Sequence, residues 1–140
     1  MAVGTVVLTP GASFALALPT LDLSDHHLPP DEWTARCALM IAAANPAPPA
    51  LLVLARDHAA NAPALGFAQR SARRAVAGYV LVDPVLPAVG GDWPDAPVTV
   101  ILTPGADTDT RSAALGARLR GWEVVEGEAV GLIGQIATRP

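Results

Sequence analysis

The 140-residue chain contains no lysine, and its nine basic side chains are all arginines spread along the sequence. With 13 acidic residues the formal net charge is −4, which argues against a nucleic-acid partner because such partners require a basic surface. The chain has one cysteine, Cys37, which has no partner for an internal disulfide. A lone cysteine fits a reducing compartment, so we expect a cytoplasmic protein.

Long apolar runs and aromatic side chains are also scarce. No segment reaches the ~18 unbroken apolar residues of a membrane span, and the apolar first twenty residues lack the basic start of a signal peptide. We therefore expect no membrane partner. Aromatic residues make up 4% of the chain and hydrophobic residues 51%, so the core must be built from Ala, Val and Leu. We expect residues 1–140 to form one domain.

Short apolar segments alternate with segments of helical composition. Strands are predicted, from their β-branched and apolar runs, at residues 3–8, 15–23, 51–55, 78–84, 98–102 and 122–125. Helices are predicted, from their capping residues and apolar spacing, at residues 29–45, 61–74, 107–120 and 128–137. In the third of these helices, Leu115 and Leu119 are the expected core anchors. The alternation predicts an α/β fold with a doubly wound, mostly parallel sheet of five to six strands.

A charged turn follows the most apolar strand. Arg56, Asp57 and His58 come directly after residues 51–55 and before an alanine-rich helix. In an open parallel sheet, ligands bind in the crevice at the carboxyl ends of the strands. Three consecutive ionisable residues in so apolar a segment favour a site over an ordinary polar turn.

One sequence repeat connects the first strand with a later one. Residues 5–12 and 99–106 match at seven of eight positions, and both end in Thr-Pro-Gly-Ala. The two copies are followed by unrelated sequence, and their separation fits no repeat architecture. We interpret them as two strands that need the same exit turn.

The order of these segments resembles a trimmed, lidless α/β-hydrolase. Residues 6–11 look like the strand and turn that supply the oxyanion loop, and residues 21–26 are similar to the Asp-Leu-Pro-Gly-His loop of that superfamily. Residues 52–68 look like its nucleophile elbow, and the strands at 79–84 and 98–109 like those that precede its catalytic acid. The resemblance implies a minimal α/β-hydrolase-like core with the first strand beside the central one.

The chain differs from that superfamily at the positions of the catalytic residues. The elbow motif G-x-S-x-G places the nucleophile on a strained turn, but neither possible register here contains Ser or Cys. Asp57 takes the nucleophile position if the elbow is 55–59, and His58 takes it if the elbow is 56–60. No histidine follows the last strand, so residue types exclude a Ser-His-Asp triad.

The remaining residues can still perform acid–base or aspartate-based catalysis. Asp57 and His58 are the expected catalytic pair, with Asp83 or Asp107 orienting the histidine. Substrate contacts are expected, from the resemblance and from loop position, at four residues: Gly11, Ala12, Ser13 and Arg56. The backbone N–H groups of Gly11 and Ala12 are the expected oxyanion donors.

No cofactor is expected. A cluster of metal-capable side chains occurs within six residues of one loop, at Asp22, Asp25, His26 and His27. Without a second cluster it is better explained as a solvated loop, so no metal site is predicted.

Two functions follow as hypotheses. The first is an enzyme acting on a small, largely apolar molecule by non-serine chemistry, either hydrolysis or a lyase, cyclase or isomerase step. The alternative is a pseudo-hydrolase that serves as a binding or partner protein. A homodimer is also expected, because no helix follows the first strand and one apolar sheet face would be covered only by residues 128–137.

Overall fold

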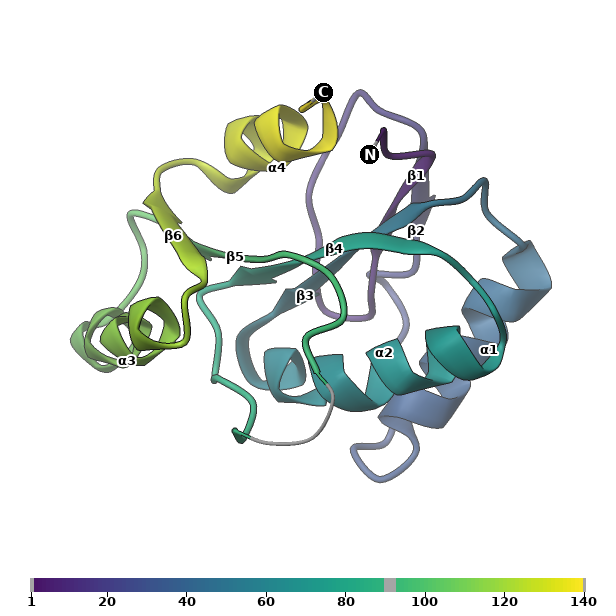
Figure 1. The fold of residues 1–140 in the computed structure, drawn as a ribbon, viewed down its shortest axis with the longest axis horizontal. Helices are drawn as coiled ribbons and strands as arrows, with labels where there is room; N and C mark the ends of the chain where they lie inside the picture. Colours follow the sequence, from purple (N-terminus) through teal and green to yellow (C-terminus); the bar gives the residue numbers. More distant parts are fainter. Residues whose placement is uncertain (1, 90–92, 140) are drawn as a thin grey trace.

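The computed structural model describes residues 2–89 and 93–139, which form one six-stranded sheet in the order β2-β1-β3-β4-β5-β6 (Figure 1). All five strand pairs are parallel. The strands are β1 (Thr5–Leu8), β2 (Thr20–Asp22), β3 (Ala50–Ala55), β4 (Val76–Val82), β5 (Val98–Leu102) and β6 (Glu123–Glu126). The α/β prediction is confirmed, and β1 lies beside the central strand β3 as expected.

Helices cover both faces of the sheet. Three of them, α1 (Trp33–Ala44), α2 (Ala62–Ser71) and α3 (Thr108–Leu119), contribute to one hydrophobic core, whereas α4 (Ala129–Ala137) contributes to the other. Figure 1 shows α4 on one side of the sheet and α1 and α2 on the other. No helix in the described ranges is both long and apolar enough to cross a membrane.

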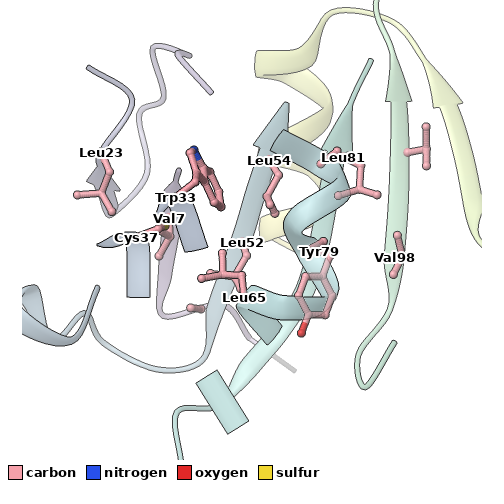
Figure 2. Packing of buried hydrophobic residues seen from close by; sticks show 14 of the residues in the cluster. Val7, Leu23, Trp33, Cys37, Leu52, Leu54, Leu65, Tyr79, Leu81 and Val98 are labelled. Carbon is pink, nitrogen blue, oxygen red and sulfur yellow. The ribbon is translucent and has the colours of Figure 1, made fainter. Parts of the chain in front are cut away.

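The central strand is buried on both faces because its side chains alternate between the two cores. Leu52 and Leu54 pack into the core under α1 and α2, and Leu51 and Val53 into the core under α4. Figure 2 shows the first core, with Trp33 on one side of Leu52 and Leu54 and Tyr79 on the other. The unbroken apolar run of β3 is thus the sequence signature of a strand with no solvent-facing side.

The predicted core anchors of α3 are wrong. Leu115 is 62% exposed and Leu119 is 89% exposed, whereas Ala114 and Ala117 face the sheet and are buried. Both stripes have helical spacing, and the alanine stripe packs against the sheet because small side chains let the helix approach closely.

The segment between β1 and β2 corrects two further expectations. Only Thr20–Asp22 of the predicted strand at 15–23 is a strand, and residues 9–19 contain a turn at residues 10–11 but no helix or strand. Along residues 12–18 the side chains alternate, with Phe14, Leu16 and Leu18 packed against the α4-side core and the residues between them exposed. This extended segment and α4 together cover the face that was expected to be open. The premise of the homodimer is therefore wrong, and the homodimer itself stays a prediction.

Candidate functional site

A pocket of ≈ 290 Å³ lies at the carboxyl edge of the sheet, where four neighbouring strands end. Its walls come from the exits of β1, β3, β4 and β5, and consist of Gly11, Ser13, Phe14, Ala55, Arg56, Val82, Asp83 and Thr103. The pocket includes the point where the strand order reverses, since β2 lies on one side of β1 and β3 on the other. Open α/β sheets bind ligands at such switch points.

Arg56 stands on the turn that leaves the central strand, and its backbone is strained. It is the first residue after β3 and has φ = 53°, a left-handed conformation that a branched or long side chain rarely adopts. Its carbonyl accepts a hydrogen bond from the backbone N–H of Val85 at 3.0 Å, which fixes the turn. The guanidinium is exposed and forms no hydrogen bond or ion pair within the described part of the chain.

Asp83 occupies the matching position after β4 and is also strained, with φ = 45° although a proline follows. Its carboxylate accepts two hydrogen bonds from Thr103, one from the backbone N–H at 2.9 Å and one from the hydroxyl at 2.6 Å. Its own N–H donates to the carbonyl of Ile101 at 2.9 Å. Each carboxylate oxygen accepts one of these bonds and can accept another, and Asp83 lines the pocket.

Asp57 and His58 do not line this pocket. They lie in a short 3₁₀ helix, η1 (Arg56–Asn61), which joins β3 to α2 and was not predicted. Asp57 is exposed. The half-buried His58 ring stacks on Trp33 with ring centroids 5.0 Å apart and an interplanar angle of 12°. It also lies against Gly11, where an added Cβ would come within 2.8 Å of His58 Cδ2.

The expected orienting carboxylates have other partners. Asp107 caps α3, since its Oδ1 accepts a hydrogen bond from the N–H of Thr110 at 2.7 Å. Hydrogen bonds from Thr110 lower the pKa of Asp107, and the nearby charge of Arg56 lowers it further by a smaller amount. Neither Asp83 nor Asp107 is hydrogen-bonded to His58 in residues 2–89 and 93–139.

The expected oxyanion donors are both engaged. The N–H of Gly11 donates to the carbonyl of Ser24 at 3.2 Å, and the N–H of Ala12 to the carbonyl of Thr9 at 2.9 Å. Ala12 is also fully buried and does not reach the pocket. The next two N–H groups, those of Ser13 and Phe14, find no acceptor among the described residues, and both residues line the pocket.

Each copy of the repeated sequence forms a hydrogen-bonded turn at the exit of its strand. The N–H of Ala12 bonds the carbonyl of Thr9, and the N–H of Ala106 bonds the carbonyl of Thr103 at 3.0 Å. The turns lie at the exits of β1 and β5, and each contributes to the pocket. The repeat thus gives both strands a hydrogen-bonded exit turn, but the two turns differ in conformation, since Gly11 has φ = 94° and Gly105 has no positive φ.

The loop that carries Asp22, Asp25, His26 and His27 holds no metal-binding constellation. Asp22 accepts hydrogen bonds from the hydroxyl and the N–H of Ser24, and these bonds lower the pKa of Asp22. The other three residues are exposed. Across the described ranges, no three His, Cys, Asp or Glu side chains come close enough to hold a metal ion.

Sequence reasoning placed Gly11, Ser13, Arg56 and Asp83 in the site, and the structure brings these four residues together in one pocket. It missed the other four lining residues, which are Phe14, Ala55, Val82 and Thr103. The repeat could have pointed to Thr103, because the first copy was already assigned to the site through Gly11 and Ala12.

No protein-family model, curated protein or solved structure matches this chain. A functional assignment therefore has to come from the residues of the pocket themselves.

Proposed function

We propose that this chain binds a small molecule in the carboxyl-edge pocket, with Arg56 pairing an anionic group of the ligand and Asp83 accepting a hydrogen bond from a donor group. One observation carries the proposal. Arg56 lines the pocket, its guanidinium has no hydrogen bond or ion pair among the described residues, and its backbone is held in a strained conformation.

The strained backbone of Arg56 lowers the stability of the fold, and no hydrogen bond or ion pair of its side chain within the described residues offsets this loss. A non-glycine residue at positive φ costs roughly 1–3 kcal/mol, and glycine would adopt the same turn freely. Arg56 therefore contributes less to stability than glycine would at this position. Such strain is common at ligand sites, where it aims a side chain at the ligand.

The other walls define the rest of the ligand. Phe14, Ala55 and Val82 offer apolar surface, and the unpaired N–H groups of Ser13 and Phe14 offer two more donors. Since the pocket contains one cation and one carboxylate, it suits a ligand that has both an acidic group and an amino or hydroxyl group. Small amino acids and hydroxy acids with a short apolar body have this chemistry.

Binding without catalysis is the better supported of the two hypotheses. The candidate catalytic pair lies outside the pocket, and the expected oxyanion donors are used internally. We also propose a relation to the α/β-hydrolases, because a strained turn follows the central strand here as it does in their nucleophile elbow. In that case Arg56 occupies the elbow position, rather than Asp57 or His58. An arginine there cannot serve as a nucleophile, which fits a pseudo-hydrolase.

A second candidate function is acid–base chemistry by His58. It is favoured by the packing of the imidazole between Trp33 and the backbone of Gly11, which fixes the plane of the ring beside the switch point. His58 has no side-chain hydrogen bond to any residue that the structure describes, so its ring nitrogens are available to a bound molecule as a general acid or base. This candidate places the substrate next to the pocket rather than inside it.

The experiment is a thermal-shift screen with small amino acids, hydroxy acids and their amides, followed by calorimetric titration of the hits. We expect hits to need a free carboxylate, and Arg56→Gly to weaken their binding roughly tenfold or more, as expected for loss of a charge-assisted pair. Arg118→Ala is the matched control, since this exposed arginine lines no part of the pocket. Hits that bind Arg56→Gly as tightly as the natural chain would refute the role of Arg56.

A further inference from the structure

A second pocket lies at the opposite edge of the sheet, where β3 begins, between the C-terminal ends of α1 and α2. Its volume is ≈ 350 Å³. Four polar residues line it, and no acidic residue does: Asn45, Gln69, Arg73 and Arg74. This amino-edge pocket shares no residue with the carboxyl-edge pocket.

Gln69 is the first sign of a ligand. The residue is only 2% exposed, lines the amino-edge pocket, and its side-chain amide forms no hydrogen bond with any described residue. Neither amide atom is among the fully buried side-chain atoms that lack a partner, so the amide keeps an accessible edge although the residue as a whole is buried. A group in the pocket can therefore accept a hydrogen bond from it.

The charges around Gln69 indicate the sign of the ligand. Arg74 donates to Asn45 Oδ1 at 3.1 Å and to the carbonyl of Ala42 at 3.4 Å, and its Nε has no partner. Arg73 has no ion pair or side-chain hydrogen bond within the described part of the chain. Two guanidinium groups with spare donors therefore stand at a pocket without a carboxylate.

Two helix carbonyls at this edge already accept backbone hydrogen bonds and so do not pair with those donors. The carbonyl of Ile41 accepts from the N–H of Asn45, and the carbonyl of Gln69 accepts from the N–H of Arg74, both at 2.9 Å. The spare donors of Arg73 and Arg74 are thus available to an acceptor from outside the chain.

We propose that the amino-edge pocket binds a small carboxylate that has an apolar body. The planar guanidinium fork matches a carboxylate, and Gln69 can donate to one of its oxygens. The apolar wall for the rest of the ligand is formed by Ile41, Pro46, Pro48 and Ala50. This site is separate from the proposed function and does not depend on it.

Benzoate is the probe, with benzyl alcohol as its neutral counterpart, in an NMR titration of ¹⁵N-labelled protein. We expect benzoate to shift the amide signals of residues 41–50 and 69–75 and to saturate in the millimolar range, whereas benzyl alcohol gives much smaller shifts. Arg73→Gly is the main variant. Because Arg73 has φ = 57°, glycine removes the charge and relieves the backbone at once, so the variant should fold.

Arg73→Gly should weaken benzoate binding roughly tenfold, and Gln69→Leu should also weaken it, whereas Arg56→Gly and Arg118→Ala should leave it unchanged. Absence of saturable shifts at residues 41–50 and 69–75 would overturn the proposal. So would equal binding to Arg73→Gly, or equal shifts with benzyl alcohol. Loss of benzoate binding in Arg56→Gly would show that benzoate binds in the carboxyl-edge pocket, and this result would also refute the proposed amino-edge site.

Discussion

Asp83 and Thr103 join the exits of two neighbouring strands, because the carboxylate accepts from both the N–H and the hydroxyl of the threonine. The first copy of the repeated sequence uses its threonine in a related way. The hydroxyl of Thr9 donates to the carbonyl of Val53 at 2.7 Å, on the strand next to its own. In both copies the threonine after the strand connects the strand exit to the neighbouring strand or its exit turn, which gives the repeated threonine a structural role.

Thr103→Val should lower the free energy of unfolding by about 1.5–3 kcal/mol, as expected when a buried charge-assisted hydrogen bond is lost at constant side-chain shape. Urea unfolding followed by circular dichroism measures the change. The control is Thr108→Val, at an exposed residue whose hydroxyl makes no hydrogen bond in the described ranges. Equal losses of stability in both variants would show that the hydrogen bond from the Thr103 hydroxyl to Asp83 adds nothing beyond the general effect of replacing a hydroxyl by a methyl group.

Arg56→Gly should make the protein slightly more stable, by up to about 1 kcal/mol, because relief of the left-handed backbone exceeds the entropy that glycine adds to the unfolded chain. Arg36→Gly is the matched control. Arg36 lies inside α1, where glycine should cost about 1 kcal/mol. Both are measured by urea unfolding. A loss of stability in Arg56→Gly similar to that in Arg36→Gly would mean that the turn is not strained.

Much of the fold could be predicted from the sequence, because the strands are short, apolar and separated by strong turn residues. The helix starting at residue 62 and the cap at Asp107 were both near their expected places. Leu115 and Leu119 could not be placed correctly, since α3 has two apolar stripes and only packing against the sheet selects the alanines.

The site was harder to predict than the fold. The strained backbone lies at Arg56, and not at Asp57 or His58, because of the way η1 follows β3. A positive φ at an arginine cannot be predicted from the residue types. The covering of the second sheet face by residues 12–18 was missed because the alternation of alanine with larger apolar residues was interpreted as a weak strand.

Gly11→Ala should destabilise the protein by more than about 1 kcal/mol, for two reasons. Gly11 has φ = 94°, and the added Cβ would clash with the His58 ring and push it off Trp33. The tryptophan fluorescence and the urea midpoint should both change. Gly131→Ala is the control, because this α4 glycine has open space around it and alanine there should stabilise the helix by about 0.5–1 kcal/mol. If Gly11→Ala is as stable as the natural chain, His58 is not held by this contact.

Asp107→Ala should show a stability loss that depends on pH. The pKa of Asp107 is lowered below its ordinary value of 3.8 by the hydrogen bonds from Thr110, so the folded state favours the carboxylate. A lowered pKa means that the stabilisation is fully present above pH 3.8 and is lost as the pH falls through the folded pKa. The difference between the natural chain and Asp107→Ala should therefore be constant above pH 3.8 and shrink below it.

Asp107→Asn separates the charge from the cap. Asparagine accepts the same hydrogen bond from the N–H of Thr110 but has no carboxylate to titrate, so its difference from Asp107→Ala should not change with pH. Asp109→Ala serves as the second control, because Asp109 lies in the first turn of α3 but does not cap it. Urea unfolding well above and well below pH 3.8 measures all four proteins. If the loss in Asp107→Ala stays the same at both pH values, the capping bond does not depend on the charge of Asp107, and its lowered pKa contributes nothing to stability.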